Sequence, residues 1–141
     1  MFIFKFKFQI FSLLSACSDG SVYIHDLNNF TGRPNYTATC VCKVAKNNEN
    51  AHKYSVECTT WYGNDNELFI TSGTDKLLKI WDANSLKAVE NFKSKGRIFH
   101  HCCSPIPTSN PIVAGKFNLG WQINFLNKFL ILINNFQWQA L

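Results

Sequence analysis

The chain has 141 residues, of which 46% are hydrophobic and 16% are charged, and its formal net charge is +5. This composition indicates one globular domain with an apolar core and excludes a disordered tail. The lysines are scattered along the sequence rather than grouped in a run, which is typical of a solvated surface. We therefore predict no direct binding of nucleic acid.

Residues 1–11 are predicted to form an amino-terminal extension. Phe4 and Phe6 alternate with Lys5 and Lys7, which is the period of two that indicates a β-strand. The apolar start ends in Leu-Ser-Ala-Cys at residues 14–17, which imitates the signal peptide of an exported lipoprotein. The lysines interrupt the continuous apolar run that a signal peptide needs, so a strand is favoured over export.

Two β-hairpins follow in the sequence, at residues 11–26 and 68–82. Each combines two short apolar segments with a turn, which contains Asp19-Gly20 in the first hairpin and Gly73-Thr74-Asp75 in the second. Further strands are predicted at residues 36–42, 54–61, 87–92 and 97–103. The polar residues 46–50 are predicted to form a surface loop.

The hairpins are similar in sequence, and residues 14–26 align with residues 70–82. A second alignment lays Val56 on Ile98 and Ile70 on Ile112, and it predicts a weaker third unit with a degenerate third strand at residues 119–125. A repeat of about 40 to 45 residues is the length of one four-stranded propeller blade. The repeats therefore predict an all-β chain built of successive blades.

The second unit resembles the WD-repeat β-propellers. The family pattern has a Gly-His dipeptide, a hydroxyl residue on the second strand, an aspartate in the following turn and a terminal Trp-Asp pair. Here His52, Thr71, Asp75 and Trp81-Asp82 occupy these places. The resemblance implies a structural tetrad of hydrogen-bonded side chains, formed by His52, Thr71, Asp75 and Trp81.

The first unit matches the same pattern in a degenerate form. It keeps Ser15, Asp19 and Asp26, but His25 stands where the tryptophan would be. The resemblance implies an incomplete WD-repeat β-propeller of about two to three four-stranded blades. The predicted WD-repeat region is residues 12–116, and residues 117–141 form a divergent carboxy-terminal segment. The apolar run at residues 129–133 is too short for a membrane-spanning helix, so no membrane association is expected.

Within the WD-repeat proteins, residues 52–105 most resemble the Cockayne syndrome A family of DNA excision repair proteins. The resemblance rests on residues 52–57 and 75–86 and on His100-His101. It implies a substrate receptor of a nuclear cullin-RING ubiquitin ligase acting in transcription-coupled nucleotide excision repair. The implied partners are the ligase adaptor and repair or transcription proteins. Receptors of this class often carry an arginine two residues after Trp-Asp, and Asn84 occupies that place.

Other readings of the sequence predict different chemistry. His100-His101-Cys102-Cys103 could suggest a metal site, but successive strand side chains point to opposite faces, and we predict no metal and no cofactor. A cysteine-based enzyme could pair Cys58 with His52 or His100. We predict that the chain is not an enzyme, because it lacks phosphate-binding and hydrolase motifs.

A further alternative is a truncated fragment without independent function. The chain is long enough for about three blades, whereas a closed propeller has about four to eight. Unpaired sheet edges of an open propeller are expected to pair with another chain.

Overall fold

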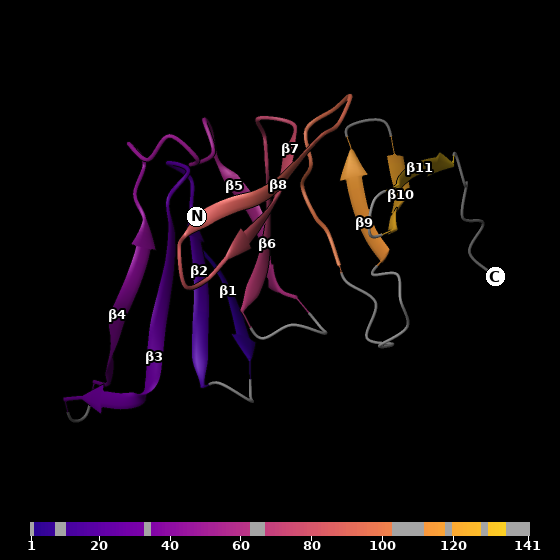
Figure 1. Cartoon of the computed structure of the whole chain (residues 1–141). Helices are drawn as coiled ribbons and strands as arrows, with labels where there is room; N and C mark the ends of the chain where they lie inside the picture. The colour runs from indigo at the N-terminus through magenta and orange to yellow at the C-terminus, as the bar shows by residue number, and fades with distance from the viewer. Residues whose placement is uncertain are drawn as a thin grey trace.

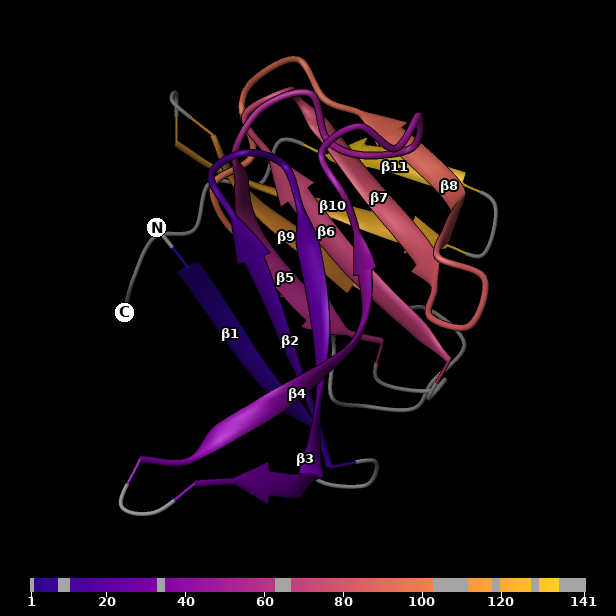
Figure 2. The same cartoon turned by 90° about the vertical axis from the view of Figure 1, so that its left-hand side faces the viewer.

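The computed structural model describes residues 2–7, 11–32, 35–62, 67–102, 112–117, 120–127 and 130–134. Within these residues all regular secondary structure is β-strand, in three antiparallel sheets that follow one another along the chain (Figure 1). Figure 2 shows the first sheet in front of the second and the second in front of the third. This is an all-β, partial propeller, as the sequence predicts.

The first two sheets have four strands each, in sequence order from one edge to the other. The first contains β1 (Phe2–Lys7), β2 (Ser12–Cys17), β3 (Val22–Thr31) and β4 (Thr37–Val44). The second contains β5 (Val56–Trp61), β6 (Leu68–Gly73), β7 (Leu77–Asp82) and β8 (Lys87–Lys93). The third contains β9 (Ile112–Phe117), β10 (Gly120–Asn127) and β11 (Leu130–Asn134), with β10 in the middle.

Both predicted hairpins are confirmed, as β2–β3 and β6–β7. The strand predicted from the alternating amino-terminal residues is β1, which pairs with β2 from Phe2 opposite Cys17 to Lys7 opposite Ser12. The predicted loop at residues 46–50 lies in the connection between β4 and β5. The segment set apart as an extension therefore contributes a strand to the first sheet.

The second sheet is covered on both faces. One core lies between the first two sheets and includes Leu14, Ala16, Val56, Phe69 and Trp81. On the other face, Ile70 and Leu78 pack with Ile98 from the segment that follows β8. Strand β6 is accordingly buried from Phe69 to Gly73, whereas the outer strand β8 alternates between exposed and half-buried residues.

The strand predicted at residues 97–103 is wrong for residues 97–102, which form no strand, and residue 103 lies outside the described residues. The rest of the second alignment stays a prediction. Ile98, which this alignment lays on Val56, packs against Ile70 and Leu78 of the second sheet, and Val56 likewise packs in the core shared with the first sheet. The predicted third strand at residues 119–125 overlaps β10, the middle strand of the third sheet.

Among the described residues, no helix is long and apolar enough to span a bilayer.

Candidate functional site

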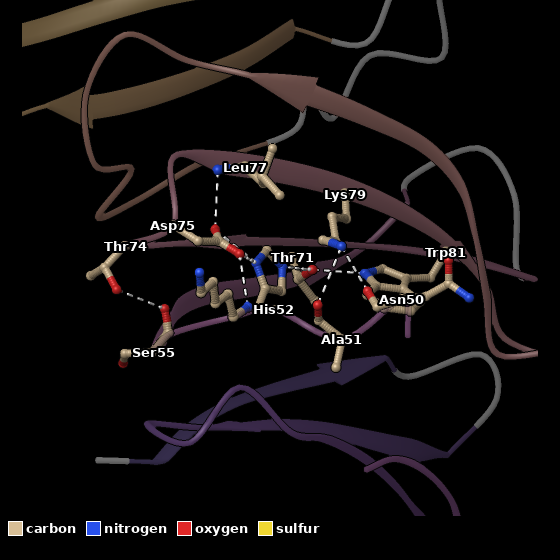
Figure 3. A network of polar contacts seen from close by, with 11 residues as sticks. Asn50, Ala51, His52, Ser55, Thr71, Thr74, Asp75, Leu77, Lys79 and Trp81 are labelled. Carbon is tan, nitrogen blue, oxygen red and sulfur yellow. Dashed lines mark hydrogen bonds and ion pairs between the residues drawn. The ribbon is translucent and has the colours of Figure 1, made fainter. Parts of the chain in front are cut away.

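The predicted tetrad residues lie in one chain of hydrogen bonds inside the second sheet (Figure 3). His52 comes from the β4–β5 connection, Thr71 from β6, Asp75 from the β6–β7 turn and Trp81 from β7. His52 Nδ1 lies 2.9 Å from Asp75 Oδ2, and His52 Nε2 lies 2.7 Å from Thr71 Oγ1. Trp81 Nε1 donates to the same hydroxyl oxygen at 2.7 Å. We call these four residues the relay.

The chemistry of the groups fixes the direction of the relay. A carboxylate only accepts, so His52 Nδ1 carries the proton that is donated to Asp75. In the neutral imidazole, Nε2 then accepts the hydroxyl proton of Thr71. The Thr71 oxygen in turn accepts the indole N–H of Trp81. Each group therefore uses the atom that its neighbour requires, and the relay joins the β4–β5 connection to both strands and the turn of the β6–β7 hairpin.

Asp75 closes one end of the relay and also shapes the turn. Its carboxylate accepts the backbone N–H groups of Lys53 and Leu77, both at 3.1 Å. Burial alone would raise the pKa of Asp75, but the hydrogen bonds from His52 and from these two amides outweigh burial and hold the pKa below its ordinary value of 3.8. The ionised carboxylate is thus the form that the fold stabilises.

Aromatic packing surrounds the other end of the relay. The ring of Trp81, which is completely buried, stacks on Phe69 with centroids 5.8 Å apart and an interplanar angle of 4°. Trp61 meets Phe69 edge to face at 6.0 Å. This apolar shell excludes water, so a polar group of the relay that lost its partner would have no replacement.

Lys79 is a buried residue that our sequence analysis did not single out. Its Nζ donates to the carbonyl oxygens of Asn50 at 2.7 Å and Ala51 at 3.4 Å, and it lies 5.7 Å from the ring centroid of Trp81. Burial lowers the pKa of Lys79 below its ordinary 10.5, although the charge of Asp75 opposes this. Lys79 thereby ties the β4–β5 connection to β7, directly before His52.

Two glycines allow the backbone to pack closely beside His52. A Cβ at Gly20, where φ is +93°, would overlap the backbone carbonyl oxygen of His52. A Cβ at Gly73 would lie 2.6 Å from the Ser55 carbonyl oxygen and 3.1 Å from His52 Nδ1. Gly20 belongs to the β2–β3 turn of the first sheet, so the relay residue His52 is seated against the neighbouring sheet.

The structure connects only part of the degenerate first-repeat set. Ser15 Oγ lies 2.9 Å from His25 Nε2, so this pair occupies the places of Thr71 and Trp81. Asp19 instead accepts from the backbone and the hydroxyl of Ser21 within its own turn. Asp26 accepts the N–H of Asn28 at 2.8 Å, a local contact within β3 where the pairing with β4 shifts register.

The side chains of Cys58 and His100 are in contact, which is one of the two pairings considered above for a cysteine-based enzyme. Cys58 Sγ lies 3.2 Å from His100 Nδ1 and 3.5 Å from the carbonyl oxygen of His101. His101 Nδ1 is 2.8 Å from Ser72 Oγ. Because Cys58 is only 2% exposed, these contacts hold the segment after β8 against the second sheet and do not present a thiol to a substrate.

The described residues form neither the second cysteine–histidine pair nor a metal site. His52 bonds to Thr71 and Asp75, so the alternative pair of Cys58 with His52 is not formed there. Within residues 11–102, apart from the gaps given above, no group of three or more His, Cys, Asp or Glu side chains is placed to hold a metal ion. Cys103, the last member of the suspected metal cluster, lies outside the described residues.

Comparison with known proteins supports the repeat assignment. No protein-family model matches the sequence. Over 109 residues the chain is 36% identical to the WD repeat-containing protein ATCSA-1 of Arabidopsis thaliana, an alignment that covers 72% of this chain and 24% of that protein. It is 45% identical over 40 residues to Radiation-sensitive protein 28 of Saccharomyces cerevisiae, covering 28% of this chain and 8% of that protein.

The fold is similar to that of a solved propeller. The β-propeller domain of Cps50 (Swd1) from Myceliophteria thermophila superposes with a TM-score of 0.67 at 15% sequence identity, over 88% of this chain and 34% of that chain. At such low identity the similarity shows the fold alone. The chain spans about a quarter of the Arabidopsis relative. The sequence similarity and the shared fold together support the WD-repeat family for this chain, with its sheets as blades of a partial β-propeller.

Proposed function

We propose that the chain is a protein-interaction scaffold of the Cockayne syndrome A type, a substrate receptor of a cullin-RING ubiquitin ligase that acts in transcription-coupled nucleotide excision repair. The observation that carries this proposal is the 36% identity to ATCSA-1 over 72% of the chain. The shorter similarity to a protein named for radiation sensitivity agrees with a role in DNA damage. WD-repeat propellers generally act by mediating contacts between proteins.

The structure supports binding rather than catalysis. Asp75, His52 and Thr71 are connected in the same order as the acid, base and hydroxyl of a hydrolase triad. Thr71 is completely buried and its oxygen already accepts the Trp81 N–H. No substrate carbonyl can reach this hydroxyl without unfolding the sheet. The relay therefore stabilises a rigid blade, and the exposed turns at the ends of the strands are left for partners.

Docking to the ligase adaptor provides the test. Asn84, the residue at the place of the receptor arginine, is exposed in the β7–β8 turn, and its N–H donates to Asp82 Oδ1 at 2.8 Å. We expect the adaptor to bind the chain and Asn84→Arg to bind about tenfold more tightly, because guanidinium groups form charge-assisted hydrogen bonds.

Asn28 offers a matched control for this experiment. Its N–H donates to Asp26 Oδ1 at 2.8 Å, which is the same local geometry in the first repeat. Asn28→Arg should leave adaptor affinity unchanged. If the adaptor bound neither the original chain nor Asn84→Arg in a titration by calorimetry, the ligase part of the proposal would be wrong.

The same proposal places the chain in the nucleus. Imaging of the tagged chain in cells tests this directly. Exclusion of the tagged chain from nuclei, before and after DNA damage, would count against a role in repair.

A further inference from the structure

Cations gather at one end of the strands of the second blade. The β2–β3 turn, the β4–β5 connection, the β6–β7 turn and the segment after β8 all lie towards the top of Figure 1. In the second blade this end carries exposed cations, namely Lys53, Lys76, Lys95 and Arg97. At the opposite end, Asp26 lies within β3, Glu67 directly before β6 and Asp82 at the end of β7, with Lys87 at the start of β8, so this end is mainly acidic. The first end also carries exposed acids, Asp19 and Glu49, but the cations of the second blade gather there.

Backbone hydrogen bonds hold the basic segments together around one turn. The N–H of Ser94 donates to the Lys76 carbonyl oxygen at 2.8 Å, and the N–H of Ile98 donates to the Gly73 carbonyl oxygen at 3.2 Å. These bonds fix the segment that carries Lys95 and Arg97 beside the β6–β7 turn. Lys53 is joined to the same turn, as its N–H donates to Asp75 Oδ2. We call Lys53, Tyr54, Lys76, Lys95 and Arg97 the basic rim.

Asp75 lies at the centre of the basic rim, but its carboxylate is paired with His52 and not with a rim cation. Asp75 is half-buried and its two oxygens accept bonds from His52 and from the backbone of Lys53 and Leu77. Among the residues that the structure describes, no carboxylate forms an ion pair with the side chain of a rim cation. The basic rim thus presents unpaired positive charge on segments that the relay keeps in place.

We propose that the basic rim binds a short acidic segment of a protein partner. This inference deepens the proposed scaffold function, on which it rests, by naming the chemistry of one partner. Glutamate and aspartate side chains complement a compact group of cations. Single-stranded nucleic acid fits less well, because it needs aromatic faces for stacking along a track. The exposed rim aromatic is Tyr54, and Lys53 Nζ already lies 5.7 Å from its ring centroid.

Binding of a fluorescein-labelled oligoglutamate peptide to the full chain, followed by fluorescence anisotropy, tests the proposal. Lys76→Glu and Lys95→Glu should each weaken binding by about tenfold or more. Lys87→Glu is the matched control, since it makes the same charge change at an exposed site at the start of β8, beside the acidic end. It should weaken binding by less than about twofold, because the screening length is about 8 Å at physiological salt.

Two outcomes would overturn the proposal. Equal weakening by Lys87→Glu and the rim variants would mean that the peptide responds only to net charge. Tighter binding of an oligothymidylate of matched charge, with the same sensitivity to Lys76→Glu, would assign the basic rim to nucleic acid instead. No ligase component is present in this assay, so its result is separate from that of the adaptor titration.

Discussion

Thr71→Val removes the centre of the relay while keeping the shape of the side chain. The substitution leaves the Trp81 indole N–H and His52 Nε2 without the hydroxyl that each contacts at 2.7 Å. Both groups are buried, and an unpaired buried polar group costs about 1 to 3 kcal/mol. The expected loss is therefore about 2 to 6 kcal/mol, a large part of the roughly 5 to 15 kcal/mol that stabilises a typical domain.

Urea unfolding followed by circular dichroism measures this loss. With a slope of about 2 kcal/mol per molar, the middle of the usual range for urea, the midpoint for Thr71→Val should fall by about 1 to 3 M. Thr71→Ser keeps the hydroxyl and should lose only about 1 kcal/mol, for the missing methyl group.

Thr59→Val is the matched control for the valine substitution. Thr59 is equally buried and pairs with Thr71 across the sheet, but its hydroxyl makes a single bond, to the Ile70 carbonyl oxygen at 3.2 Å. It should cost about 1 kcal/mol. If Thr71→Val were no less stable than Thr59→Val, the relay would not stabilise the blade and our reasoning would fail.

Three further outcomes are expected. The fold lowers the pKa of Asp75, so the stabilisation that its carboxylate provides is present above its ordinary pKa of 3.8 and is lost as the pH falls through the folded pKa. Asp75→Asn and Asp75→Ala should therefore be less stable than the original chain at neutral pH. Between about pH 5 and pH 2 they should lose less free energy of unfolding than the original chain, as measured by urea unfolding. Gly20→Ala should lower the melting temperature and displace His52, whereas Gly32→Ala, at φ +90° in another turn, should lower it without changing the His52 ring signals in NMR spectra. Cys58 should resist a thiol reagent in the folded chain and react once the chain is unfolded in urea; rapid labelling of the folded chain would revive the cysteine-enzyme alternative.

The second blade could be predicted almost completely from the sequence. Its hairpin has a short apolar strand on either side of a turn with glycine and aspartate, and these local signals do not depend on distant contacts. The positions of Thr71, Asp75 and Trp81 follow from the strand and turn that carry them. Lys79 could also have been placed, since it lies two residues before Trp81 and therefore on the same face of β7.

The absence of a strand at residues 97–102 could not be predicted, because strand pairing depends on distant partners. The apolar residues there fit a strand by composition, but they form no strand, and Ile98 packs against Ile70 and Leu78 of the second sheet. The seating of His52 against Gly20 was missed for the same reason. It joins residues of different sheets, and nothing in either local sequence predicts that approach.

Hydrogen exchange of the Trp81 indole N–H, measured by NMR on the native chain, tests the relay most directly. This proton should exchange only when the blade unfolds, with an opening free energy close to that of global unfolding in urea. Exchange as fast as that of a solvent-exposed indole would show that Trp81 does not donate to Thr71, and would contradict the account.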